Sequence, residues 1–334
     1  MKAVLCEQFG PPDTLVIREV VDPVAGKGQV VVRIHAAGVN FPDTLIIEDK
    51  YQLKPALPFS PGGEVAGVIE SVGEGVTRVK PGDRVIAFPG YGGYAEKVCV
   101  DQTRITRLPE GVSLVHAAAL TTTYGTTHHA LKDRAQIQPG ETLLVLGAAG
   151  GTGISAVELG KLMGARVIAA ASSQEKLDFC RAHGADETID YSREDLRERI
   201  KALTRGKGVD VVYDPVGGKY SELAIRSMAW NGRFLVIGFT AGEIPRIPLN
   251  LPLLKGCSIV GVYYGGSLQA EPERGEANMA ELMAWFRSGR VTPYVSQTYP
   301  LEQAAQALDD IATRRAKGKI VLVTAAGAAE QSAP

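Results

Sequence analysis

The pattern of hydrophobic and polar positions changes near residue 114. Before that point, short runs of apolar and β-branched residues are separated by turns rich in Pro and Gly. They predict strands at 1–6, 15–20, 29–36, 64–72, 84–88 and 93–100. Many short strands with turn residues between them are typical of an all-β unit, and a partly open β-barrel is the form we expect.

Beyond residue 114 the pattern predicts a helical segment at 114–131 and then strands alternating with helices. The strands are expected at 142–147, 166–171, 187–190, 209–214 and 233–238, and the helices at 153–163, 174–183, 193–205 and 219–229. This alternation predicts an α/β unit with a doubly wound parallel sheet. Further elements are expected at 258–264, 276–288, 301–314 and 320–324, and the small, polar residues 325–334 are expected to be flexible.

The most informative stretch is the glycine turn between the strand at 142–147 and the helix that follows it. Gly147 lets the chain leave the strand sharply, and Gly150 and Gly151 remove Cβ atoms where a phosphate must approach. Thr152, in the same turn, is a further candidate for cofactor binding. Gly153 permits close packing of helix on strand. The spacing is G-x-x-G-x-x-G, which alone also fits an ordinary strand-to-helix turn, but the βαβ pattern around it favours a dinucleotide at the helix N-terminus.

The tip of the next strand indicates which dinucleotide binds. An NAD site usually carries Asp or Glu about 20 residues beyond the glycines. Here Ser172 and Ser173 follow the strand, with Lys176 one helical turn on, and Glu175 is expected to point away on the first turn of that helix. Hydroxyls and a cation suit a 2′-phosphate, so NADPH is the predicted cofactor.

Composition excludes several classes of function. The 36 basic and 37 acidic residues nearly cancel, and no basic cluster predicts binding to nucleic acid or to an anionic membrane. No apolar run approaches the roughly 20 residues of a membrane span, and no signal peptide is apparent. Four widely spaced cysteines fit a reducing compartment, so a cytoplasmic protein is expected.

Several motifs in order resemble the medium-chain dehydrogenase/reductase superfamily, and specifically its zinc-free quinone oxidoreductase branch, which includes zeta-crystallin. The resemblance covers nearly the whole chain. It implies a GroES-like catalytic domain at 1–122, a Rossmann domain at 123–260, a return to the catalytic domain at 261–325 and a flexible tail at 326–334. The motifs lie at 36–43, 58–67, 81–85, 147–153 and 212–218.

The same resemblance implies that no metal is bound. Zinc members carry a Cys ligand where Asn40 stands and a His ligand where Gly63 stands, and neither replacement can supply a thiolate or an imidazole. The four-cysteine structural zinc lobe is also missing. His128 and His129 are adjacent on a helix and point in different directions, so they do not form a metal site either.

Without a metal, the resemblance implies hydride transfer from NADPH to an activated acceptor in an interdomain cleft. The acceptor is expected to be a quinone or a related activated alkene. A reductase of enals, enones or enoyl thioesters is the alternative within the enzyme class. An NADPH-binding protein with little turnover is the alternative outside it, and a zinc alcohol dehydrogenase is a weaker third.

Three residues resemble family positions at the active site and are the candidate catalytic residues. Asn40 and Asp43 flank Pro42, and both also suit a turn there. Tyr51 could stack on a quinone or donate a proton to its oxygen, although water could be the donor and a packing role for Tyr51 is also open.

The remaining cofactor candidates lie near the predicted strand ends. Thr126 resembles a threonine near the nicotinamide, and packing is an equally open reading. Tyr191 resembles a tyrosine beside the adenosine 2′-phosphate. Phe239 follows a strand, and Val262 and Tyr263 are expected at the return to the catalytic domain. The apolar strand at 258–264 is expected at a sheet edge, where pairing with a second chain would give a homodimer.

Overall fold

The structure is a computed structural model that describes residues 1–331 and divides the chain into two compact units. The first comprises Met1–Thr122 and the segment from Met283 onward, and the second comprises Thr123–Leu282. The sequence places the return to the first unit at residue 261. The later return follows from two helices, α9 (Tyr264–Ala270) and α10 (Pro272–Arg287), that come directly after the last strand of the second unit.

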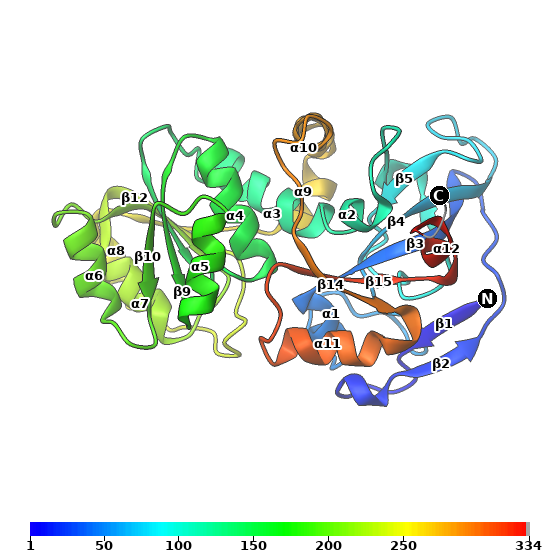
Figure 1. The fold of residues 1–334 in the computed structure, drawn as a ribbon, viewed down its shortest axis with the longest axis horizontal. Helices are drawn as coiled ribbons and strands as arrows, with labels where there is room; N and C mark the ends of the chain where they lie inside the picture. The colour runs from blue at the N-terminus through cyan, green and yellow to red at the C-terminus, as the bar shows by residue number, and fades with distance from the viewer. Residues whose placement is uncertain (332–334) are drawn as a thin grey trace. The chain divides into compact units, whose positions relative to one another are not determined.

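A seven-stranded sheet forms the centre of the first unit (Figure 1). Its order is β14-β15-β3-β4-β5-β7, and β6 also pairs with β3. The strands are β3 (Gln29–Val39), β4 (Glu64–Val72), β5 (Arg84–Ala87), β6 (Lys97–Asp101), β7 (Ile105–Arg107), β14 (Val295–Pro300) and β15 (Lys319–Val323).

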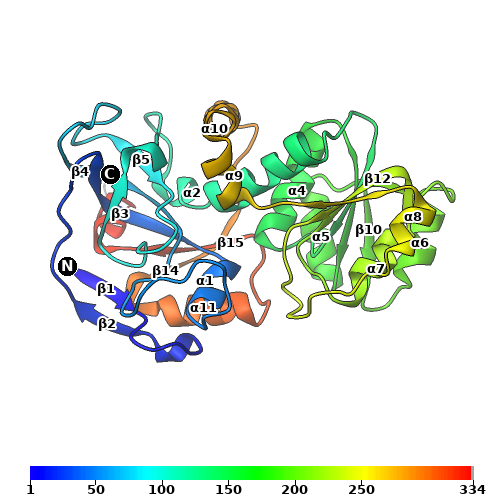
Figure 2. The same ribbon diagram turned by 180° about the vertical axis from the view of Figure 1, so that it is seen from behind.

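Elements from both ends of the sequence complete this unit. The strands β1 (Lys2–Leu5) and β2 (Val16–Glu19) form a separate antiparallel pair (Figure 2). The short helix α1 (Phe41–Ile46) contacts α11 (Ala304–Ala312). Buried apolar side chains from β3, β4, α11 and β15 share one core, which explains why the C-terminal segment belongs to this unit.

The C-terminus corrects the predicted flexible tail. Residues Ala325–Gln331 form the helix α12, which lies against β3. Gly327 makes this contact possible, because a Cβ there would lie 2.1 Å from the carbonyl oxygen of His35. Glu330 bonds to both His35 and Arg84 at 2.7 and 2.9 Å. The helix therefore depends on long-range contacts that its small, polar sequence does not predict. Residues 332–334 of the predicted tail lie outside the described residues.

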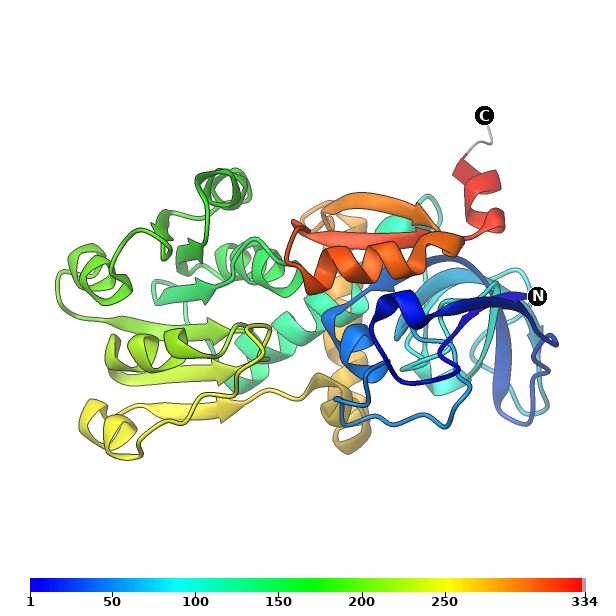
Figure 3. The same cartoon turned by 90° about the horizontal axis from the view of Figure 1, so that it is seen from below.

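A parallel sheet with strand order β10-β9-β8-β11-β12-β13 forms the centre of the second unit. In Figure 3 the yellow strand β13 lies at one edge of it, as the sequence predicts. The strands are β8 (Thr142–Leu146), β9 (Arg166–Ala171), β10 (Glu187–Asp190), β11 (Val209–Asp214), β12 (Met228–Val236) and β13 (Ser258–Gly261).

The helices of this unit follow the strands closely. They are α4 (Gly151–Leu162), α5 (Gln174–Ala182), α6 (Leu196–Leu203), α7 (Lys219–Arg226) and α8 (Asn250–Lys255). The strands at 166–171, 187–190 and 209–214 have the predicted bounds, because buried apolar runs between glycine turns give a clear signal. By contrast, the sequence did not predict β14, α8 or α9.

The segment predicted as one helix over 114–131 is divided. It begins with α2 (Leu114–Ala117) and continues through a π-helical turn (Thr121–Gly125), α3 (Thr126–His128) and a second π-helical turn (His129–Arg134). Within it, the hydroxyl of Tyr264 stands 2.5 Å from where a Cβ on Gly125 would be, so a larger residue would clash there. π-Helical turns of this kind are frequent at functional sites.

Candidate functional site

Most cofactor candidates of the second unit lie at the end of its sheet where the strands terminate. All six strands are parallel, so their carboxyl ends meet there, at the carboxyl end of the sheet. The strand order reverses between β8 and β11, which makes this pair the topological switch point, where ligands of open α/β sheets bind. The sequence-predicted turn at 147–153 follows β8 and therefore stands at the switch point.

The glycine turn has the predicted geometry. Gly147 has φ +59°, a conformation that favours glycine. Gly150 is the N-cap of α4 and has no side chain that could cap the helix, so the first N–H groups of the helix depend on other partners. A Cβ on Gly153 would lie 2.3 Å from the Gly147 carbonyl oxygen, which shows that this glycine permits close packing. Gly151 and Thr152 lie in the first turn of α4 and are half-buried.

The loop after β11 stands on the other side of the switch point. Asp214 is buried, and one of its carboxylate oxygens accepts the N–H groups of Val216 and Gly217 at 2.8 and 2.9 Å. The other accepts the hydroxyl of Ser221 at 2.6 Å. Burial raises the pKa of Asp214 despite these bonds. This carboxylate shapes the loop, and Val216 lies close to Gly147 across the switch point.

The residues predicted to hold a 2′-phosphate follow two neighbouring strands. Ser172 and Ser173 follow β9 and Tyr191 follows β10, and the Tyr191 N–H bonds to the carbonyl of Ala171 at 3.1 Å. Ser172 is exposed. Ser173 is the N-cap of α5 and accepts the N–H of Lys176. A hydroxyl can accept there and still donate to a phosphate. Because β9 and β10 are neighbours, the tertiary structure brings these four residues together.

The remaining cofactor candidates, near β12 and β13, differ in their surroundings. Phe239 follows β12 and packs close to Gly217. Val262 follows β13 and its N–H bonds to the carbonyl of Val236 at 3.1 Å. Tyr263 is the residue before α9 and is 60% exposed. Both Val262 and Tyr263 lie inside the second compact unit, which ends at Leu282.

A buried hydroxyl network lies beside the glycine turn. Thr126 is half-buried, whereas the next residue, Thr127, is completely buried. The Thr127 hydroxyl lies 2.7 Å from that of Ser155 on α4 and 2.9 Å from that of Tyr213 on β11. Burial raises the pKa of Tyr213 well above its ordinary range. The network ties the segment that carries Thr126 to both sides of the switch point.

A charged network is buried at one end of the sheet in the first unit. Asn40 is 8% exposed, and its amide nitrogen donates to Glu64 at 2.8 Å and to the Gly38 carbonyl at 3.3 Å. Its amide oxygen accepts from the Lys319 ammonium at 2.6 Å. Lys319 also forms an ion pair of 2.6 Å with Glu64, and these two residues are 2% and 1% exposed. Asn40 is thus held at both ends of its amide.

Asp43 extends this network along α1. Its Oδ2 accepts the hydroxyl of Tyr94 at 2.8 Å and the backbone N–H of Asn40 at 2.9 Å. Burial raises the pKa of Asp43 to about 6, and the two hydrogen bonds limit the rise. The pKa of Tyr94 is raised well above its usual range by burial and by the neighbouring carboxylate of Asp43. Asp43 therefore titrates near neutral pH, which suits a group that exchanges protons.

The third candidate catalytic residue of this unit is Tyr51. It is half-buried and packs against the apolar core of the first unit. The packing alternative for Tyr51 therefore has direct support. Whether its hydroxyl also serves the reaction stays a prediction.

Sequence reasoning missed three residues of this network, and they come from distant segments. Glu64 was noted only as part of a motif, and Tyr94 and Lys319 were not singled out. The register of the sheet brings them together, since Ile320 pairs with Val39 and Glu64 pairs with Gly38. A buried-strand lysine in the segment 319–323 was the available signal, because lysine is almost never fully buried unless it is paired.

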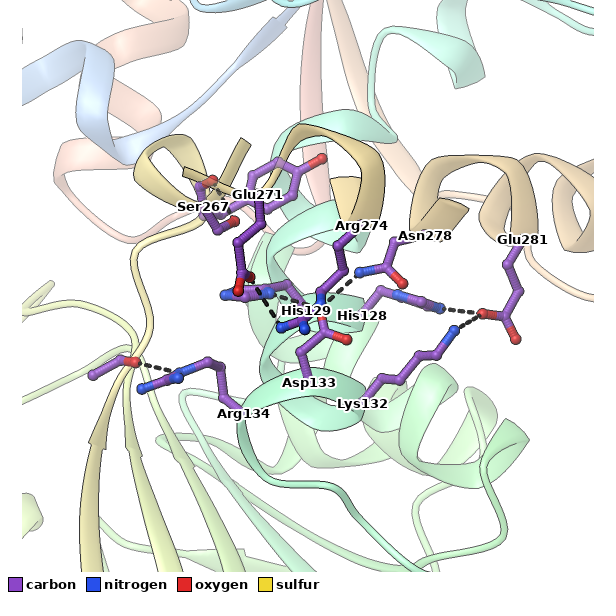
Figure 4. A network of polar contacts seen from close by, with 12 residues as sticks. His128, His129, Lys132, Asp133, Arg134, Ser267, Glu271, Arg274, Asn278 and Glu281 are labelled. Atoms are coloured by element: carbon purple, nitrogen blue, oxygen red, sulfur yellow. Dashed lines mark hydrogen bonds and ion pairs between the residues drawn. The ribbon is translucent and has the colours of Figure 1, made fainter. Parts of the chain in front are cut away.

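The two adjacent histidines of this helical segment, His128 and His129, have structural partners (Figure 4). His128 lies 3.0 Å from Glu281 of α10, and His129 lies 2.8 Å from Asp133. Lys132 also bonds to Glu281, and Asn278 donates to Asp133 at 2.7 Å. Among residues 1–331, no group of three or more His, Cys, Asp or Glu side chains could hold a metal ion. The histidines instead join the helical segment to α10.

Known proteins resemble both units. A family described as "Zinc-binding dehydrogenase" matches residues 151–285, and one described as "Alcohol dehydrogenase GroES-like domain" matches residues 26–110. The quinone oxidoreductase-like protein 2 homolog of Nematostella vectensis is 39% identical over 97% of this chain and 89% of its own length.

Solved structures agree with this assignment. The Escherichia coli quinone oxidoreductase complexed with NADPH has a TM-score of 0.91 and 30% identity, covering 97% of this chain and 100% of that one. The CurK enoyl reductase has a TM-score of 0.88 and 26% identity, covering 97% and 99%. The chain therefore belongs to the quinone oxidoreductase branch of the medium-chain dehydrogenase/reductase superfamily, a family of oxidoreductases, and the predicted GroES-like and Rossmann fold class is confirmed.

No helix within residues 1–331 is both long and apolar enough to cross a bilayer.

Proposed function

We propose that this protein is an NADPH-dependent, zinc-independent reductase that transfers a hydride to quinones or related activated alkenes. The observation that carries the proposal is the arrangement of residues at the carboxyl end of the parallel sheet. There the glycine turn stands at the topological switch point, and Ser172, Ser173 and Lys176 follow β9, while Glu175 is exposed on the first turn of α5. The likeness to a quinone oxidoreductase complexed with NADPH supports the same cofactor.

The residues at the carboxyl end of the sheet match the chemical groups of NADPH. The turn at 147–153 and the N-terminus of α4 would hold the pyrophosphate, because backbone N–H groups and the helix dipole attract anions. Ser172, Ser173, Lys176 and Tyr191 would hold the 2′-phosphate. Thr126, Phe239, Val262 and Tyr263 would border the nicotinamide. When bound, NADPH supplies a hydride from C4 of its nicotinamide ring.

In the first unit, Asp43 and Tyr51 are the residues proposed to serve the acceptor, and Asn40 is proposed to hold the start of the helix that carries Asp43. Asp43 could release or take up a proton near neutral pH, since burial raises its pKa to about 6. This adds a third candidate to Tyr51 and water for protonation of the product oxygen. Catalysis would otherwise come from proximity and orientation.

The cofactor assignment is tested by Lys176→Ala. Loss of this ammonium should raise KM for NADPH at least about tenfold and leave KM for NADH within about twofold, because charged hydrogen bonds contribute roughly 1.5–3 kcal/mol. Lys201→Ala on α6 is the matched control and should change neither KM. Equal effects of Lys176→Ala on both cofactors would remove the 2′-phosphate assignment.

A second experiment identifies the hydride acceptor. The likeness to an enoyl reductase supports including activated alkenes among the candidates. The test follows NADPH oxidation at 340 nm with 1,4-benzoquinone, 9,10-phenanthrenequinone, 2-hexenal and crotonyl-CoA, each with and without EDTA. Turnover that EDTA does not reduce is expected, fastest with a quinone. Faster turnover of 2-hexenal or crotonyl-CoA would favour the enal or enoyl-thioester alternative. Tight NADPH binding with no turnover would favour a binding protein.

A homodimer formed through β13 is part of the proposal. The strand lies at the sheet edge, where unpaired backbone groups can pair with a second chain. Large apolar side chains near it are exposed, among them Trp230, Leu253, Leu254 and Ile259. Light scattering should show a dimer at micromolar concentration and a monomer for Ile259→Arg. A wild-type monomer would refute the assembly.

The four free thiols fit a cytoplasmic location.

A further inference from the structure

We propose that Glu64 and Lys319 are positioning residues, whose buried ion pair fixes the amide of Asn40 and sets the charge state of Asp43. The inference rests on the proposed roles of Asn40 and Asp43. It concerns residues from β4 and β15 that contact Asn40, the N-cap of α1, only because the sheet brings β3, β4 and β15 together.

The ammonium of Lys319 is held by three acceptors. Its Nζ lies 2.6 Å from Glu64 Oε1, 2.6 Å from Asn40 Oδ1 and 3.1 Å from the Val39 carbonyl oxygen. A lysine has three N–H donors, so each one can be used. A buried ammonium is tolerated when it is paired and fully hydrogen-bonded, which means that this geometry is strongly preferred over any other.

The pair fixes the orientation of the Asn40 amide. Lys319 can only donate, so it requires the amide oxygen, and the Glu64 carboxylate requires the amide nitrogen. A flipped amide would place a donor against the ammonium and an acceptor against the carboxylate. The amide itself is therefore not available for substrate in this arrangement, and its role is to hold the start of α1.

Gly38 makes the room for this arrangement. A Cβ on Gly38 would lie 2.3 Å from Glu64 Oε1 and 2.3 Å from the Ala118 carbonyl oxygen. The second carboxylate oxygen of Glu64 accepts the N–H of Thr122 at 2.7 Å. Glu64 thereby also holds the beginning of the helical segment that carries Thr126 four residues later.

The link from the pair to Asp43 is both mechanical and electrostatic. Asn40 donates its backbone N–H to Asp43 Oδ2, so a shift of Asn40 moves a hydrogen bond on that carboxylate. The charge of Lys319 favours the ionised form of Asp43, and the charge of Glu64 opposes it. In the intact pair these two influences oppose each other.

Other charged groups near α1 are accounted for. Tyr94 bonds directly to Asp43. From α11, which packs on α1, Asp310 bonds to Tyr299 and Arg315, and Asp309 bonds to Arg315. The acids of α11 are thus engaged with their own partners, and the Glu64–Lys319 pair is the buried charge pair joined to Asp43 through Asn40.

The test measures the titration of Asp43 by carboxyl carbon-13 NMR in the full chain labelled at aspartate, with Asp43→Asn used to assign its signal. Glu64→Gln leaves the ammonium unopposed and should lower the Asp43 midpoint by roughly half a unit or more. Lys319→Gln leaves the carboxylate unopposed and should raise it by a similar amount. Lys161→Gln, in an ion pair of the second unit, is the matched control and should leave the midpoint unchanged.

The two single variants are expected to shift the Asp43 midpoint in opposite directions. One folded single variant is therefore sufficient to test the electrostatic claim. Unchanged midpoints, or shifts in the same direction, would overturn it. The double variant Glu64→Gln/Lys319→Gln has no unpaired charge. With the preferred acceptor found above, it should lose at least about tenfold in kcat with little change in the KM for NADPH, whereas an unchanged kcat would overturn the positioning role. The NMR result needs no substrate, so it stands apart from failure of the proposed reaction.

Discussion

The two units of this molecule build their candidate sites in opposite ways. In the second unit, the site consists of backbone N–H groups, glycines and partly exposed side chains at strand ends, as at Gly147, Ser172 and Lys176. In the first unit, it consists of buried side chains that bond to one another, as at Asn40, Glu64 and Lys319. The first kind of site leaves polar groups for a ligand, while the second uses its polar groups to fix its own geometry.

This difference predicts that changes at the two sites will have different costs. Lys319→Ala should lower the free energy of unfolding by about 3–5 kcal/mol, because it leaves the Glu64 carboxylate buried without its partner. Lys161→Ala removes a partly exposed ion pair with Asp186 in the second unit and should cost no more than about 1 kcal/mol. Urea unfolding of both variants gives the comparison, and equal costs would break it.

The pH dependence of stability should have opposite signs at Asp43 and Asp186. The pKa of Asp43 is raised from its ordinary 3.8 to about 6, so the folded state binds its proton more readily than the unfolded state. Stability from Asp43 is therefore present below pH 4 and lost as pH rises through 6, by roughly 3 kcal/mol in total. Urea unfolding between pH 4 and 7 should show this loss in the wild type and not in Asp43→Asn.

Asp186 is the opposing case, and the same urea unfolding must be extended below pH 4 to measure it. Burial acts to raise its pKa, but the hydrogen bonds from Lys161 and the Val167 N–H, together with the charges of Lys161 and Arg166, outweigh burial, and the pKa is lowered. Its contribution is present above its ordinary pKa and lost as pH falls through the lowered value. Asp186→Asn should therefore reduce the loss of stability in acid. The same slope from both aspartates would contradict the contrast between the units.

The smallest expected effects come from two glycines of one turn. Gly153→Ala should cost about 1–3 kcal/mol of stability, because its Cβ would lie 2.3 Å from the Gly147 carbonyl oxygen. Gly150→Ala should change stability by less than about 0.5 kcal/mol, since the nearest atom would be 3.4 Å away. If Gly150→Ala nevertheless weakens NADPH binding in a fluorescence titration, its missing Cβ serves the phosphate; unchanged binding would remove that role from Gly150.

Much of the second unit could be predicted because its signals are local. Strands β9, β10 and β11 have the predicted bounds, and the glycine turn and its strand lie within a few residues of each other. The first unit was predicted only in outline. Strand β14 is mostly exposed and lacks a clear apolar run, and α12 depends on His35 and Arg84, which no local pattern connects to it.

The sequence by itself determined the alternation of strands and helices from β8 to β12, the glycine turn and the residue types at the tip of β9, because these depend on neighbours along the chain. The tertiary structure decided where the chain returns to the first unit and which polar side chains meet there. Asn40, Glu64 and Lys319 are joined by the antiparallel register of β15 with β3 and of β3 with β4. That register depends on burial of apolar residues from both ends of the chain in one core, which no local segment specifies.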